Sequence, residues 1–106
     1  MNRGEIRWYS FKPPDKRRPV LLLTRNPAVD FLTEPTVAPI TSTIRNIPSE
    51  IILHAGDGMA YPCSVNFDHL QTISKARLGD LTATLSPERM DEATQALSFA
   101  LDLENT

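Results

Sequence analysis

The longest uninterrupted apolar run in this chain, residues 20–23, is only four residues long. A membrane-spanning helix needs about 20 apolar residues, so no membrane association through such a helix is expected. The run lies within residues 19–24 (PVLLLT), between residues that break regular structure, and this pattern is typical of a short strand buried on both faces. A chain with such short apolar segments must build its core from several short elements.

Further short segments show the bulky or β-branched content of strands. Pro39 is expected to confine one of them to a sheet edge or a bulge. Residues 25–34 are expected to form a loop with at most one helical turn, and residues 56–58 (GDG) a turn. The further predicted strands are residues 5–11, 35–41, 50–54, 63–67 and 71–74, the last two being either separate strands or one bent strand.

The C-terminal segment predicts a helix over residues 87–102. Ser86 is suited to the N-cap and Pro87 to the first helical position. Apolar residues recur three or four positions apart and predict one buried face. These are Met90, Ala93, Leu97 and Leu101. Many short strands followed by one helix predict a mainly β fold, a compact barrel or strongly bent sheet with a terminal helix.

The 106 residues, 41% of them apolar and 23% charged, are typical of one soluble globular domain, expected to span residues 1–106. A single cysteine, Cys63, excludes an internal disulfide framework and is typical of a reducing compartment. The first residues show no signal-peptide pattern. A cytoplasmic protein is expected.

The net charge of −2 conceals an asymmetry along the chain. Residues 1–25 contain seven basic and two acidic side chains, whereas residues 80–106 contain six acidic side chains and only Arg89 as a base. A polyanion is therefore expected to approach the N-terminal part. The alternative is that the basic and the acidic side chains are both ordinary solvent-exposed surface without a binding role.

Motifs for nucleotide loops, zinc proteases, serine hydrolases and paired cysteines are absent. His54 and His69 lie 15 residues apart without a carboxylate at ligand spacing, so neither a metal site nor a cofactor is predicted. What remains is a permanently charged guanidinium at a strand entrance, Arg18, which matches phosphate oxygens. The hydroxyl groups of Thr41, Ser42 and Thr43 are able to donate to phosphate or bases, or to stabilise a turn.

Five segments occur in the order GEIRWYSF, RRPVLLLT, VAPITS, QTISKARLGDL and LSPERMDEATQAL. Together they resemble, over nearly the whole chain, the MazF/PemK/Kid family of bacterial ribonuclease toxins. The resemblance implies a small, strongly bent SH3-like β-barrel with a C-terminal helix, the fold shared by CcdB and Kid, assembled as a homodimer. It also implies metal-independent cleavage of single-stranded RNA, in which the ribose 2′-hydroxyl attacks the adjacent phosphate to give a 2′,3′-cyclic phosphate and a 5′-hydroxyl.

The resemblance also implies roles for individual residues. Arg18 stands at the family's arginine and is expected to stabilise the phosphate, with proton donation as a second role open to it, whereas Thr41 is expected to bond a nonbridging oxygen. Asp68 is the candidate either for the general base or for orienting the RNA. The loop of residues 12–16 (KPPDK) is shorter than in many relatives and lacks their glutamate or histidine, so Asp15 is an alternative base. RNA-binding residues are expected to be Asp15, Lys16, Arg17, Ser42, Thr43 and Asn66.

The resemblance also implies two partners. They are single-stranded RNA and a cognate antitoxin, whose acidic disordered segment folds across the groove that binds the RNA. Two alternatives keep the fold and change the function. One is a CcdB-like gyrase poison, for which this chain lacks an aromatic C-terminal tail. The other is an RNA-binding protein that has lost catalysis, which the shortened loop favours.

Overall fold

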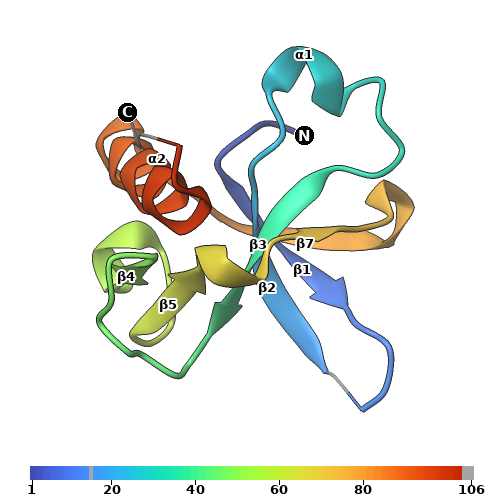
Figure 1. Ribbon diagram of the computed structural model, residues 1–106. Helices are drawn as coiled ribbons and strands as arrows, with labels where there is room; N and C mark the ends of the chain where they lie inside the picture. Colours follow the sequence, from blue (N-terminus) through green and yellow to red (C-terminus); the bar gives the residue numbers. More distant parts are fainter. Residues whose placement is uncertain (15, 104–106) are drawn as a thin grey trace.

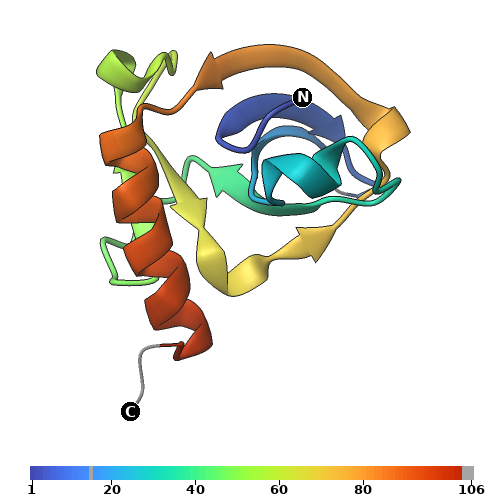
Figure 2. The ribbon, with the colours of Figure 1, turned by 90° about the horizontal axis from the view of Figure 1, so that it is seen from above.

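The structure is a computed structural model that describes residues 1–14 and 16–103. Seven strands form an antiparallel sheet in the order β4-β5-β3-β2-β1-β7, with β6 pairing the free end of β3. Figures 1 and 2 show how strongly the sheet curls and how α2 lies beside β4 and β5. The strands are β1 (Glu5–Ser10), β2 (Arg17–Leu22), β3 (Thr36–Thr41), β4 (Glu50–Leu53), β5 (Cys63–Asn66), β6 (Gln71–Thr72) and β7 (Leu78–Thr84).

In the described residues, two α-helices and three single-turn 3-10 helices connect or cover these strands. The predicted helical turn after β2 is α1, and the predicted C-terminal helix is α2. None of the helices in the described part of the chain has the length and apolar content to cross a membrane. The helices are α1 (Asn26–Val29), η1 (Ala55–Asp57), η2 (Phe67–His69), η3 (Lys75–Arg77) and α2 (Pro87–Leu101). The predicted mainly β fold with a terminal helix is therefore confirmed.

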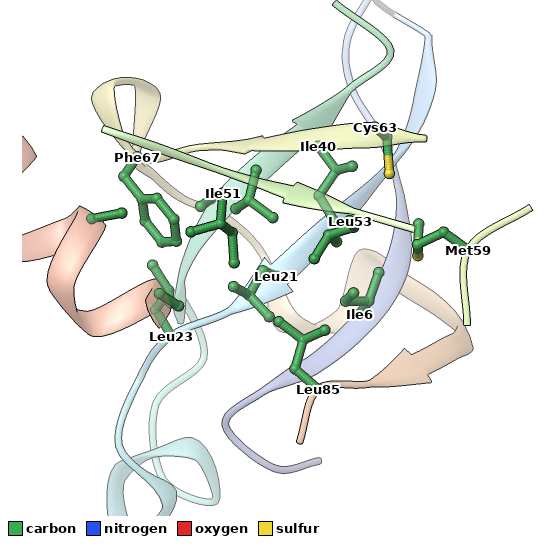
Figure 3. Packing of buried hydrophobic residues seen from close by; sticks show 14 residues of the cluster. Ile6, Leu21, Leu23, Ile40, Ile51, Leu53, Met59, Cys63, Phe67 and Leu85 are labelled. Atoms are coloured by element: carbon green, nitrogen blue, oxygen red, sulfur yellow. The ribbon is translucent and has the colours of Figure 1, made fainter. Parts of the chain in front are cut away.

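The central strand β2 is buried on both faces, as its apolar run predicts. Val20 and Leu22 face one apolar cluster, whereas Leu21 and Leu23 face the other. Figure 3 shows the larger cluster, in which side chains of β1 to β5 meet those around α2. The strand begins at Arg17, two residues earlier than predicted, so Arg18 belongs to the ladder and pairs with Tyr9.

The prediction for Pro39 is a sheet edge or a bulge. Strand β3 lies inside the sheet, so the edge is wrong, and the register of β3 with β2 shows no bulge at Pro39. Strand β3 has β2 on one side, while on the other side β6 pairs with Thr36 and Val37 and β5 pairs with Ile40 and Thr41. Pro39 falls in the gap between β6 and β5, where the ladder on that side is interrupted. A proline without an N–H donor is tolerated in a central strand at such a gap.

Helix α2 begins as predicted, because the Ser86 side chain accepts the backbone N–H of Arg89 at 3.2 Å. Its packed face gains Ala96 and Ala100 relative to the predicted stripe and loses Leu101. Ala93 and Ala96 are buried, whereas Leu101 is about half exposed and does not belong to the packed face.

The turn after η1 requires glycine at one position only. Gly58 has φ +92° and a Cβ built there would lie 2.9 Å from the Cβ of Ala83, whereas Gly56 has open space and no positive φ. We expect Gly58→Ala to lower the free energy of unfolding by about 1–3 kcal/mol. The matched variant Gly56→Ala should change it by less than about 0.5 kcal/mol. Urea denaturation followed by circular dichroism measures both, and equal effects would contradict the structure of this turn.

Candidate functional site

Three adjoining hollows meet at Arg18. The wide hollow has a volume of about 470 Å³, the central hollow about 220 Å³ and the outer hollow about 200 Å³. The wide hollow is lined by Trp8, Lys16, Arg17, Arg18, Pro19, Ile40, Thr41, Ser42, Thr43, Met59, Ala60, Tyr61, Cys63 and Thr82. The central hollow is lined by Arg18, Pro39, Thr41, Thr43, Arg45, Asn66 and His69, and the outer hollow by Phe11, Arg18, Pro39, His69 and Gln71.

Arg18 is exposed, and its guanidinium has no ion pair or hydrogen bond with any residue in the described ranges. It is held in place through its backbone, because Arg18 pairs with Tyr9 of β1. A guanidinium without a protein partner keeps all five N–H donors for a ligand. Arg18 therefore presents a planar anion-binding group to all three hollows.

Thr41 ends β3 and lies between the wide and central hollows. Its Oγ1 accepts the backbone N–H of Thr43 at 3.1 Å, so the hydroxyl both stabilises this turn and retains its own proton for donation. The sequence left a turn and a ligand contact as alternatives for this group of hydroxyls. The geometry allows Thr41 to serve both.

The predicted RNA-binding residues that the structure describes line the wide hollow or the central hollow. Lys16, Ser42 and Thr43 are exposed around the wide hollow. Arg17 stacks on Trp8 with its guanidinium carbon 4.5 Å from the ring centroid, which places a flat cationic surface in the same hollow. Asn66 is buried and lines the central hollow. Asp15 lies outside the described residues.

Asp68, the candidate base, lies on η2 next to His69 but does not line any of the three hollows. It is exposed, and its Oδ2 accepts the hydroxyl of Ser49 at 2.6 Å. Asp68 thus lies beside the central hollow, whereas Arg18, Thr41 and Asn66 line its wall.

Two residues of the central hollow were not singled out as site residues from the sequence. Arg45 pairs with the buried Glu50, with 3.4 Å between Nη1 and Oε2, so its charge is partly compensated. From the sequence, His69 is expected to be only a surface or hydrogen-bonded imidazole and not a metal ligand. No local motif marks either one, because they reach Arg18 only through the pairing of β2, β3 and β5.

Cys63 is buried in β5 and lines the wide hollow. Burial, reinforced by the negative charge of Asp57, raises the pKa of the Cys63 thiol. A thiol with a raised pKa is a poor nucleophile. Within residues 1–14 and 16–103, no three or more histidine, cysteine, aspartate or glutamate side chains are grouped to hold a metal ion.

Residues 2–101 match the family described as "PemK-like, MazF-like toxin of type II toxin-antitoxin system". The chain belongs to this family. MazF3, an endoribonuclease of Mycobacterium tuberculosis, is 39% identical over 90 residues, which are 85% of this chain and 87% of the relative. The "probable endoribonuclease MazF2" of the same organism is 38% identical over 98 residues, covering 92% and 94% of the two chains.

Solved structures of PemK-like, MazF-like toxins share the fold. The M. tuberculosis toxin MazF-mt6 superposes with a TM-score of 0.85 and 36% identity, over 92% of this chain and 96% of that one. An endoribonuclease from a mycobacterial species, solved in complex with its cognate antitoxin, gives a TM-score of 0.86 and 25% identity, over 97% and 96%. The predicted family, fold and class of enzyme, an endoribonuclease, are therefore confirmed.

Proposed function

We propose that this protein cleaves single-stranded RNA without a metal ion, by attack of a ribose 2′-hydroxyl on the adjacent phosphate. The products are a 2′,3′-cyclic phosphate and a 5′-hydroxyl. The observation that carries the proposal is the guanidinium of Arg18, which has no partner among the described residues and lies at the meeting point of three hollows. In this reaction the 2′ oxygen forms a bond to phosphorus while the bond to the 5′ oxygen breaks, so the protein must chiefly stabilise charge and move protons.

In this proposal, each residue around the phosphate has a separate role. Arg18 binds the two nonbridging oxygens through its fork, and Thr41 donates its hydroxyl to one of them. Asp68 takes the proton of the 2′-hydroxyl, and water supplies the proton that the departing 5′ oxygen takes up. Its Oδ1 has no hydrogen-bond partner in the described part of the chain, while Ser49 fixes Oδ2. That bond supports a defined orientation of the carboxylate at the edge of the central hollow.

The wide hollow suits an unpaired base next to the scissile phosphate. Trp8 carries the stacked Arg17, and Tyr61 is 74% exposed at the rim. Aromatic rings and guanidinium planes are the surfaces on which proteins stack single-stranded bases. Lys16, Ser42 and Thr43 add donors for the sugar-phosphate backbone.

The partners proposed for the protein follow from its family. A solved relative is in complex with its cognate antitoxin, and we extend this to the present chain as binding of an acidic antitoxin segment over Arg18 and the wide hollow. Such a segment would offer carboxylates where RNA offers phosphates. A homodimer acting on cytoplasmic RNA completes the proposal.

Cleavage in excess EDTA tests the proposed function. Purified protein is incubated with a pool of unstructured RNAs of varied sequence, and the fragment ends are sequenced. We expect cuts at one short sequence, at a rate independent of EDTA. RNA that is bound but remains intact across the whole pool would instead support a binding protein without catalysis.

A further inference from the structure

His69 shares two hollows with Arg18 and has no role in the proposed mechanism so far. It is the last residue of η2, it is exposed, and it lines both the central and the outer hollow. A ligand phosphate held by Arg18 in the central hollow therefore lies in the same small space as the imidazole. Which nitrogen of that ring carries a proton decides what the ring can do there.

Asn66 determines the tautomer of His69. The Asn66 side chain is buried, and its Oδ1 accepts the backbone N–H of Asp68 at 2.9 Å. Reversing the amide would place its NH₂ group against that N–H donor, so the orientation is fixed. The Nδ2 of Asn66 then lies 3.2 Å from Nδ1 of His69 and donates to it. Because Nδ1 accepts, the neutral ring carries its proton on Nε2.

We propose that His69 is a catalytic residue that acts as a neutral hydrogen-bond donor, with Nε2–H bonded to a phosphate oxygen beside Arg18, and that Asn66 is its positioning residue. This role rests on the proposed function. The ring keeps its proton throughout, so it takes no part in the proton transfers that accompany formation of the bond from the 2′ oxygen and cleavage of the bond to the 5′ oxygen. A preorganised donor in a hollow stabilises the charge that develops on phosphate in the transition state.

The proposed donor role of His69 adds no charge to a space that already holds charged side chains. Arg18 and Arg45 line the central hollow with His69, and Asp68 precedes it on η2 with its carboxylate bonded to Ser49. Arg18 supplies positive charge to this space, and Arg45 supplies less because Glu50 pairs with it. A neutral N–H adds a directed hydrogen bond without adding like charge.

The tautomer is measurable without any RNA. Long-range 1H–15N correlation spectra of the 15N-labelled protein distinguish a protonated from an unprotonated ring nitrogen, and a His69→Gln sample separates the signals of His69 from those of His54. We expect an unprotonated Nδ1 and a protonated Nε2. In Asn66→Asp the new carboxylate would accept from Nδ1–H, so protonation of Nδ1 should appear. A wild-type ring protonated at Nδ1 instead of Nε2 would overturn the inference.

Single-turnover cleavage across a range of pH tests the catalytic role. His69→Ala should slow cleavage about a hundredfold, the usual effect of losing one such donor. His69→Gln should stay within about tenfold of wild type, because its amide also donates, and the shape of the pH profile should not change. Both variants give up the hydrogen bond from the buried Asn66, so their melting temperatures are measured beside the rates and should fall by no more than a few degrees.

The outcomes separate two failures. Glutamine as inactive as alanine, together with loss of one limb of the pH profile, would mean that His69 transfers a proton and would contradict the neutral-donor role. Wild-type rates in His69→Ala would remove the ring from catalysis altogether. If the wild-type protein cuts no RNA, the proposed function fails, and the ring spectra still decide whether Asn66 sets the tautomer.

Discussion

Replacing Arg18 with alanine should slow RNA cleavage about a hundred- to a thousandfold at saturating RNA. The guanidinium is unpaired within the described chain and lies at the junction of the three hollows. Its interaction with phosphate strengthens as charge develops in the transition state, so the rate should fall far more than the affinity. Binding should weaken only several-fold, because one phosphate contact is lost. Single-turnover kinetics and a binding titration on the same RNA separate the two quantities.

Two variants control for charge and for geometry. Arg25→Ala removes the same charge from an exposed position that lines none of the three hollows, and it should stay within about twofold of wild type. Arg18→Lys keeps the charge but loses the planar fork, so its rate should lie between those of wild type and Arg18→Ala. Equal rates for Arg18→Ala and Arg25→Ala would refute the assignment of the site.

Replacing Phe67 with alanine should destabilise the fold by about 3–5 kcal/mol, the range seen when a buried ring is removed. Phe67 is only 1% exposed, and it is among the largest fully buried side chains. Figure 3 shows its ring between the end of β5 and helix α2, where it joins the same cluster as Ala93 and Ala96. Such a loss is a large share of the stability of an ordinary domain.

The effect of Phe67 bears on the site because the ring anchors η2. Asn66 precedes Phe67 in the chain and His69 follows it by two residues, so the buried ring holds the backbone that carries both. Phe67→Leu retains most of the apolar volume and should cost less than about 1.5 kcal/mol. Urea denaturation measures both variants. A loss below about 1 kcal/mol for alanine would show that η2 does not depend on this ring.

The elements that the sequence predicts well are those with local signals. The apolar run in β2 and the Ser86 cap of α2 each carry their own pattern, and both elements form. Strand β7 has no such pattern, because Gly79 and Asp80 interrupt it and most of its residues are exposed or half-buried. It forms as the outer partner of β1, with shifts in register, and only tertiary pairing determines it.

The same distinction between local signals and tertiary pairing applies to the candidate site. Arg18 and Thr41 could be chosen as candidates because each lies at one end of a strand and within a family segment. The place of His69 could not, since it depends on the adjacency of β3 and β5 and on the amide orientation of Asn66. The prediction for Pro39 failed for a related reason. Strand β3 tolerates this proline because of the gap between β6 and β5, and both of those strands lie far from Pro39 in the sequence.

The most direct test of the central claim is the fate of an RNA in which only the scissile nucleotide is a 2′-deoxynucleotide. After the cut site has been mapped, the matched oligonucleotides are incubated with protein in excess EDTA, and the products are weighed by mass spectrometry. The all-ribose RNA should yield a 2′,3′-cyclic phosphate and a 5′-hydroxyl, while the substituted RNA should bind with similar affinity and remain whole. Cleavage of the substituted RNA at the same position would contradict attack by the 2′-hydroxyl and, with it, the role assigned to Arg18.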